Sequence, residues 1–216
     1  MMNRLRPNPS LRHDIVQAVS RLKREGLLDG TGGALSMLGS TGISITAGGS
    51  ARRFWRVGHR DVLEMNASGH LLKEAESRRR LPLGAGTHAM LYSLWPAARV
   101  VIHSHAGYAF LASAFGLSLT GEPPVRPMGQ VPCLGTGLNR SIVTREDWDY
   151  QILPGQLRSF FESAATENRK ASISFLEFEH GSYVVGTKLS TAITDLALLE
   201  SGARVAVLRA QLNGNV

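Results

Sequence analysis

Hydrophobic residues follow two different periods along this chain, and the alternation between the periods predicts how it folds. After Ser10, which can cap a helix, apolar residues at 11, 15, 19 and 22 follow a helical spacing that stops near Gly26. Four later helices are expected. The first, at residues 87–95, stops at Pro96, and the second, at 106–115, is rich in small residues. The third, at 154–168, starts with Pro154, and the last covers residues 189–212.

Short apolar runs between these helices predict strands, most of which pair as hairpins. ALSML (34–38) and GISIT (42–46) flank a Gly-Ser-Thr-Gly turn, and DVLEMN (61–66) turns into HLLKE (70–74). RVVIHSH (99–105) is one more strand, and ASISFLEF (171–178) pairs with SYVVG (182–186) around His180-Gly181. Helices that alternate with hairpins predict an α/β fold in which a mainly antiparallel sheet is flanked by helices. We expect a single domain over residues 1–216.

The composition is that of an ordinary globular protein, with 43% hydrophobic and 19% charged residues. No apolar run approaches the roughly 20 residues that cross a bilayer. The N-terminal segment has no apolar stretch of the kind found in secretory signals. Cys133 is the one cysteine, so an intramolecular disulfide is excluded, and we expect Cys133 to be a small buried hydrophobe. These observations favour a cytoplasmic protein that does not bind membranes.

The net charge of +7 does not by itself indicate a partner. Arginines are scattered along the chain, apart from Arg52-Arg53 and the run Arg78–Arg80. No basic stripe is interleaved with aromatic residues in the manner of single-strand binders, so nucleic acid is not an expected partner. A role for Arg78–Arg80 in attracting an anionic substrate stays open.

The strand 99–105 ends in two histidines that carry the main chemical signal. Side chains alternate along a strand, so His103 and His105 lie on one face, about 7 Å apart at their bases, with Ser104 on the other. His180 has a similar place, where a second strand runs into a glycine turn. Catalytic zinc sites commonly use three protein ligands and keep one position open, which three histidines at two strand ends can satisfy. The alternative is that these are ordinary core or surface histidines.

Five segments, in order along the chain, resemble the class II aldolase/adducin family. HAMLYSLWPAARVVIHSHAGYA (88–109) is similar to a family segment in which a helix beginning with His leads through Pro to a strand ending His-x-His. EFEHGSYVVG (177–186) resembles the family's Asn-His-Gly strand turn. Looser similarities lie in GTGGALS (30–36), SITAGG (44–49) and DVLEMNASGHLL (61–72). The resemblance spans about residues 10–200 and implies a class II aldolase-like fold.

Membership in this family would imply a metal site and an assembly. His103, His105 and His180 would bind a divalent ion, usually Zn²⁺, with Mn²⁺, Co²⁺ or Fe²⁺ as other occupants. Family enzymes are sugar-phosphate aldolases, epimerases and dehydratases and a few decarboxylases, and membership also implies a homotetramer with sites between neighbouring subunits. Their metal acts as a Lewis acid while a carboxylate moves a proton.

On this basis we expect a metal-dependent lyase of aldolase or decarboxylase type, placed in carbohydrate metabolism. Its substrate would be a small hydroxylated molecule, with or without a carboxylate or a phosphate. Substrate contacts are expected from loop residues that expose backbone amides or stand at family loop positions, namely Gly32, Gly33, Thr46, Gly48 and Gly84.

The chain departs from the family pattern at the residue that transfers the proton. The family has Ser-Ser-Glu-x-x-x-His, and counting back from His88 places Gly84 at the Glu position and Pro82 and Leu83 at the serines. The acid/base and most of the phosphate cradle are therefore missing. Glu179, at the place of the family's Asn, and Tyr108 are the expected proton-transfer residues, with Glu177, Glu74 and Glu76 as further carboxylates nearby in sequence.

Three further interpretations stay open. The protein could keep its metal and lack catalysis, as a scaffold or interaction module of the adducin-like branch. It could act as a sugar-phosphate epimerase or dehydratase, or it could have lost the metal. Loop 82–87 distinguishes an enzyme from a scaffold, since an open space beside the metal favours a substrate and a Leu83 that plugs it favours a scaffold.

Overall fold

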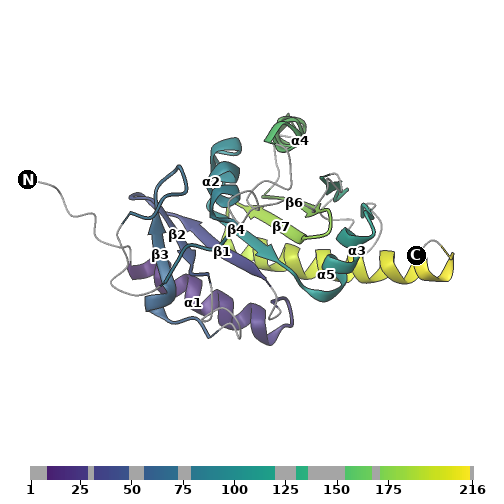
Figure 1. Ribbon diagram of the computed structural model, residues 1–216, viewed down its shortest axis with the longest axis horizontal. Coiled ribbons are helices and arrows are strands. Elements are labelled where there is room, and N and C mark those ends of the chain that lie inside the picture. The colour runs from purple at the N-terminus through teal and green to yellow at the C-terminus, as the bar shows by residue number, and fades with distance from the viewer. Residues whose placement is uncertain are drawn as a thin grey trace, which may run out of the picture.

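The structure, a computed structural model, describes residues 9–28, 32–48, 56–72, 79–119, 130–135, 154–166 and 171–214. The predicted alternation of helices and hairpins is present in these ranges (Figure 1). Along the chain the elements are α1 (Pro9–Arg24), β1 (Gly33–Leu38), β2 (Ile43–Thr46), the short 3-10 helix η2 (His59–Asp61), β3 (Val62–Met65), α2 (Ala85–Leu94), β4 (Val100–Ser104), α3 (Gly107–Ala114), β5 (Cys133–Leu134), α4 (Pro154–Thr166), β6 (Ser172–Glu177), β7 (Gly181–Gly186) and α5 (Leu189–Leu212).

Seven strands form one sheet in the order β3-β2-β1-β4-β7-β6-β5. Every neighbouring pair is antiparallel except β5 and β6, which confirms the mainly antiparallel α/β fold. The hairpin expected after β3 is reduced to a single bridge between Met65 and Leu71, and Glu74 lies outside the described residues. β4 occupies the centre of the sheet, paired with β1 on one side and β7 on the other.

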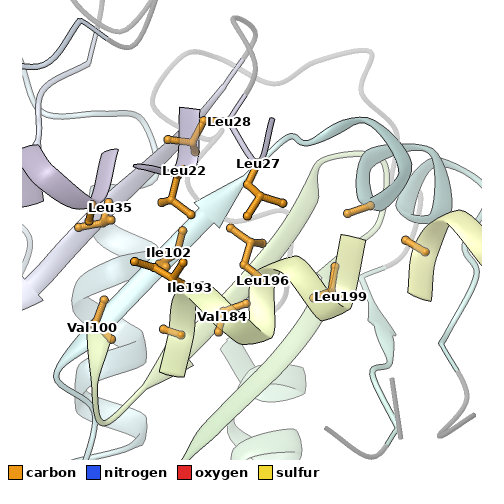
Figure 2. Close-up of a cluster of buried hydrophobic side chains, with 14 of the residues drawn as sticks. Leu22, Leu27, Leu28, Leu35, Val100, Ile102, Val184, Ile193, Leu196 and Leu199 are labelled. Atoms are coloured by element: carbon orange, nitrogen blue, oxygen red, sulfur yellow. The ribbon is translucent and has the colours of Figure 1, made fainter. Parts of the chain in front are cut away.

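Helices cover both faces of the sheet, and two separate cores lie between the layers (Figure 1). The first core packs α1, α3 and α5 against one face and contains Leu22, Ile102 and Leu196 (Figure 2). The second core packs α2 and α4 against the opposite face and contains Val101 and Phe161. None of the helices in the described ranges is long and apolar enough to span a bilayer.

Burial of β4 on both faces explains its continuous apolar sequence. Val100 and Ile102 belong to the first core, and Val101 between them belongs to the second. The alternation therefore turns His103 toward the α2 side of the sheet, where it is 4% exposed. Tertiary packing of β4 thus sets the orientation of the histidine pair at its end.

A buried polar network lies in the second core beneath α2. His88 Nδ1 is 2.7 Å from Ser36 Oγ, which is 3.0 Å from Tyr92 Oη. His88 is fully buried, and its Nε2 has no hydrogen-bond partner among the described residues. Burial lowers the pKa of His88 to about 3 and raises the pKa of Tyr92. Both side chains are therefore uncharged at neutral pH, and His88 packs inside the protein.

The neutral state of His88 predicts a loss of stability in acid. Its pKa is 6.5 in the unfolded chain and about 3 in the folded protein, so the unfolded chain binds one more proton between these values. The contribution is complete above pH 6.5 and is lost as the pH falls below it, by up to about 1.4 kcal/mol per pH unit. Urea unfolding at about pH 7, 6 and 5 measures this slope. His88→Asn should flatten it, and His70→Asn, at an exposed histidine, should leave it unchanged.

Candidate metal centre

Three histidines converge where β4 and β6 end. His103 is in β4, His105 directly follows it, and His180 lies in the turn between β6 and β7. One ligand nitrogen from each lies within 4.8 Å of the others. The three ring centroids are 4.7–4.8 Å apart, each pair edge to face. The structure therefore brings together the three residues that the sequence predicted as ligands.

The spacing and chemistry of these nitrogens suit a divalent ion. The Nε2 atoms of His103 and His105 are 3.2 Å apart. Two nitrogens bound to one tetrahedral zinc at 2.0–2.1 Å would be about 3.3 Å apart. His103 is buried, whereas His105 and His180 are partly exposed, so a small molecule can approach from their side. The residues present therefore fit a divalent ion.

Glu177 fixes the orientation of His180. The two residues begin and end a tight turn, in which the His180 amide donates to the Glu177 carbonyl over 3.0 Å. His180 Nδ1 also lies 2.6 Å from Glu177 Oε2. Because Nδ1 is held by the carboxylate, Nε2 is the nitrogen directed to a metal, an arrangement common among metal-binding histidines.

A column of stacked rings supports His103 from within the second core. The Tyr183 ring lies parallel to His103, with centroids 4.2 Å apart and planes inclined by 6°. Phe175 stacks on the other side of Tyr183 at 5.0 Å. Tyr183 is 1% exposed, so its ring has little freedom to move. The column therefore restricts the orientation of His103.

Close approach of the backbone positions His105. A Cβ at Gly32 would lie 2.1 Å from the His105 ring, so a larger residue there would displace the ring. A Cβ at Gly181, whose φ is +133°, would lie 2.4 Å from the Ser104 carbonyl. Ser104 Oγ donates to the Leu27 carbonyl over 2.6 Å and accepts from the Ala106 amide over 3.0 Å, which fixes the chain around His105.

Gly84 lies beside His103 at the start of α2. Its φ is −80°, which any residue can adopt. A Cβ there would meet only Tyr183 Oη at 3.7 Å and His103 Nδ1 at 3.9 Å, which are ordinary contacts. Leu83 is 38% exposed. Among the described residues, position 84 therefore admits a Cβ beside His103 without a clash.

Of the other predicted substrate-binding residues, Gly33 and Thr46 lie at strand ends, and Gly48 follows β2. Gly33 begins β1 and pairs with Ser104. The hydroxyl of Thr46 is buried and accepts a hydrogen bond from the Leu35 amide at 3.1 Å. Gly48 packs against Pro82, whose Cα would lie 3.0 Å from a Cβ at position 48. Glycine at 48 thus brings this loop against the loop that carries Gly84.

The arginine run is only partly available to a substrate. Arg79 Nε lies 2.6 Å from the carboxylate of Asp61, which is buried and also accepts from the Gly58 amide. Arg80 is exposed, and Arg78 and Glu76 lie outside the described residues. The Arg79 guanidinium therefore has a structural partner already.

The two predicted proton-transfer residues have different settings. Glu179 directly precedes His180, is partly exposed, and adopts a left-handed φ of 56°. Tyr108 lies on α3 and packs against the first core, with Arg204 5.5 Å from its ring centroid. Their roles stay predictions.

Sequence reasoning noted Glu177 without its contact to His180. The sequence signal for this contact was the position of Glu177 three residues before His180, because a tight turn brings two such residues together.

Cys133 is partly exposed, and so less enclosed than the small buried hydrophobe expected from the sequence. It still packs against the first core. Burial together with the negative charge of Glu177 raises the pKa of its thiol to about 11. The thiol is therefore protonated at neutral pH, which does not favour a nucleophilic role.

Comparisons with known proteins agree with this geometry. Residues 13–207 match the family described as "Class II Aldolase and Adducin N-terminal domain". No curated protein matches the sequence. An L-fuculose 1-phosphate aldolase structure is similar with a TM-score of 0.75 and 17% identity, covering 97% of this chain and 91% of that one. The L-fuculose-1-phosphate aldolase of Thermus thermophilus has a TM-score of 0.69 and 21% identity, covering 97% and 98%.

A third solved structure has a broader description. YgbL of Escherichia coli, for which aldolase, epimerase and decarboxylase are all named as candidate activities, has a TM-score of 0.68 and 21% identity. The match covers 93% of this chain and 89% of YgbL. At these identities the three structures establish a shared fold.

Backbone strain at Glu179 predicts a stabilising substitution. A left-handed conformation costs an ordinary L-residue about 1 kcal/mol, and asparagine tolerates it better than glutamate. Glu179→Asn should therefore raise the free energy of unfolding by up to about 1 kcal/mol, as measured by urea titration. Glu179→Ala, which keeps the strain, serves as the control. Equal stability of the Asn and Ala variants would contradict this explanation.

Proposed function

Because this chain belongs to the class II aldolase and adducin family, we propose that it is a divalent-metal-dependent lyase, an aldolase or decarboxylase that cleaves a C–C bond. The observation that carries the proposal is the convergence of His103, His105 and His180, with ligand nitrogens within 4.8 Å of one another. A family fold by itself does not fix an activity. The histidine cluster supplies the chemical argument that the fold lacks.

The donor set favours zinc. Three imidazoles are typical of catalytic zinc sites that keep a position open for water or substrate. Imidazole also suits iron. Fe²⁺, Co²⁺ and Mn²⁺ are the other proposed occupants. When bound, the ion supplies Lewis-acid polarisation of a substrate oxygen.

The remaining steps belong to the protein. Gly84 leaves room for substrate atoms beside His103, and Gly32, Gly33, Thr46 and Gly48 are the proposed substrate-binding residues around it. Glu179 and Tyr108 are the proposed proton-transfer residues, since position 84 carries no carboxylate. Glu179 is the stronger of the two because it adjoins His180 in the turn.

The proposed substrate is small and hydroxylated. Pro82 and Leu83 stand where the family resemblance places phosphate-binding serines, which favours a carboxylate over a phosphate as the anionic group. Arg80 is an exposed cation on the same loop and suits such a group. Within this proposal the protein works in cytoplasmic carbohydrate metabolism.

A catalytically inactive scaffold of the adducin-like branch is the second candidate, and an epimerase or dehydratase the third. Exposure of Leu83 and the room at Gly84 favour a ligand over a scaffold. An epimerase or dehydratase would use the same metal and differ in the bond that breaks.

The proposed assembly is a homo-oligomer of single-domain chains, residues 1–216, with a tetramer as the family-based expectation. Apolar side chains on and beside α3 support self-association, because Phe110, Leu111 and Phe115 are 37–46% exposed. Phe110 also lies next to His105, with ring centroids 6.1 Å apart. A neighbouring subunit on this face would border the metal centre. Size-exclusion chromatography with light scattering measures the assembly.

The proposal predicts one divalent ion per chain, held by the three histidines. Elemental analysis of the purified protein, and titration of metal-free protein with Zn²⁺, measure it. His105→Ala should lose the ion, and His70→Ala, at an exposed histidine, should retain it. Saturating Zn²⁺ at about 100 times the dissociation constant should stabilise the fold by about 2.7 kcal/mol. A wild-type protein that binds no ion would sink the enzyme proposal.

The proposal also predicts metal-dependent cleavage of a small substrate. The metal-loaded protein should release an aldehyde or CO₂ from a member of a panel of hydroxy acids, keto acids and sugar phosphates. His105→Ala should lower the rate by at least about 100-fold, since the Lewis acid contributes several kcal/mol. Metal binding without turnover of any member of the panel would favour the scaffold. Inversion of a substrate stereocentre would favour the epimerase, and release of water would favour the dehydratase.

A further inference from the structure

We infer that Glu177 supplies, through His180, the negative charge that this metal site lacks at Gly84, and that Glu177 thereby sets the affinity of the site for its ion. The inference rests on the proposed metal binding. It assigns a positioning role to a residue that touches neither ion nor substrate, and it explains how the site works without a carboxylate at position 84.

Glu177 is built into the protein as a buried partner of one ligand. It is the last residue of β6 and pairs in register with Gly181 of β7. It is 4% exposed, so its carboxylate is largely removed from water, and a buried charge of this kind is retained where it has a partner. The only partner that the hydrogen bonds of the described residues give its side chain is His180 Nδ1 at 2.6 Å.

This contact determines what His180 offers to an ion. With its Nδ1 held by the carboxylate, the ring presents the Nε2 lone pair in a fixed direction and becomes a stronger metal ligand. The hydrogen bond to His180 thus places a negative charge directly behind one ligand of the site.

Position 84 makes the charge of Glu177 important. Three neutral imidazoles leave the full positive charge of a divalent ion uncompensated within the ligand set. A Cβ at Gly84 would meet no atom of the described residues closer than 3.7 Å, so these residues do not enforce glycine there by packing. Its φ of −80° does not require glycine either. The space beside His103 therefore stays open to substrate, while the compensating charge comes from behind His180.

Substitution of Glu177 by an uncharged isostere separates its charge from its shape. Glu177→Gln keeps the size and one hydrogen-bond acceptor. In the full-length protein, Zn²⁺ affinity measured by competition with a chromophoric chelator should fall about 10- to 100-fold. Glu64→Gln is the matched control, because Glu64 also accepts hydrogen bonds on a strand but lies near the opposite edge of the sheet. Its Zn²⁺ affinity should equal that of the wild type.

A rescue experiment excludes a merely structural role. Gly84→Glu introduced into the Glu177→Gln protein places a carboxylate beside His103, and Zn²⁺ affinity should return to within a few-fold of the wild type. Gly84→Gln in the same background adds the same bulk without charge and should restore nothing. Thermal unfolding of the metal-free proteins shows whether each variant folds.

The outcomes separate this inference from the proposed function. Wild-type affinity in Glu177→Gln overturns the inference and leaves the metal site intact. Weak binding that Gly84→Gln restores as well as Gly84→Glu also overturns it, because bulk rather than charge would then be responsible. A wild-type protein without Zn²⁺ affinity overturns the proposed function and this inference together.

Discussion

Burial of β4 in the middle of the sheet is the constraint on which the rest of the structure depends. Its first three residues belong alternately to the two cores, and β1 and β7 hold it on both edges. A strand fixed in this way has one register and one orientation, because a slip by a single residue would turn its apolar side chains to the wrong core. His103 is thereby turned toward α2, and His105 is delivered beyond the strand end to meet His180.

The polar groups of the interior follow from the same burial. Ser36, His88 and Tyr92 satisfy one another under α2, where a charged imidazole would be costly. Glu177 is buried as well and is paired with His180. The two arrangements show the two ways in which this fold accepts a buried titratable group, one by keeping it neutral and one by giving it a partner.

The fold could be predicted from local sequence because its signals are local. Helical spacing after Ser10, the apolar runs of the strands and the His-x-His at the end of one of them each lie within a few residues. The contact of Glu177 with His180 depends on the conformation of the turn between them, including a left-handed Glu179, which residue spacing does not specify. The partner of Arg79 is Asp61, a residue that only the folded chain brings near. Room at Gly84 was likewise beyond prediction, because it depends on where the Tyr183 ring and Leu83 lie after packing.

Glu200 has a consequence for how the protein is made. Its carboxylate, on α5, accepts hydrogen bonds from the amides of Tyr108 and Ala109 at 2.8 Å each, and so ties the start of α3, just beyond His105, to the C-terminal helix. The neighbourhood of the histidines thus draws on residues from Gly32 to Glu200. A nascent chain on the ribosome lacks this tie until its last helix has emerged. A chain interrupted before α5 would therefore present His103 and His105 without this tie.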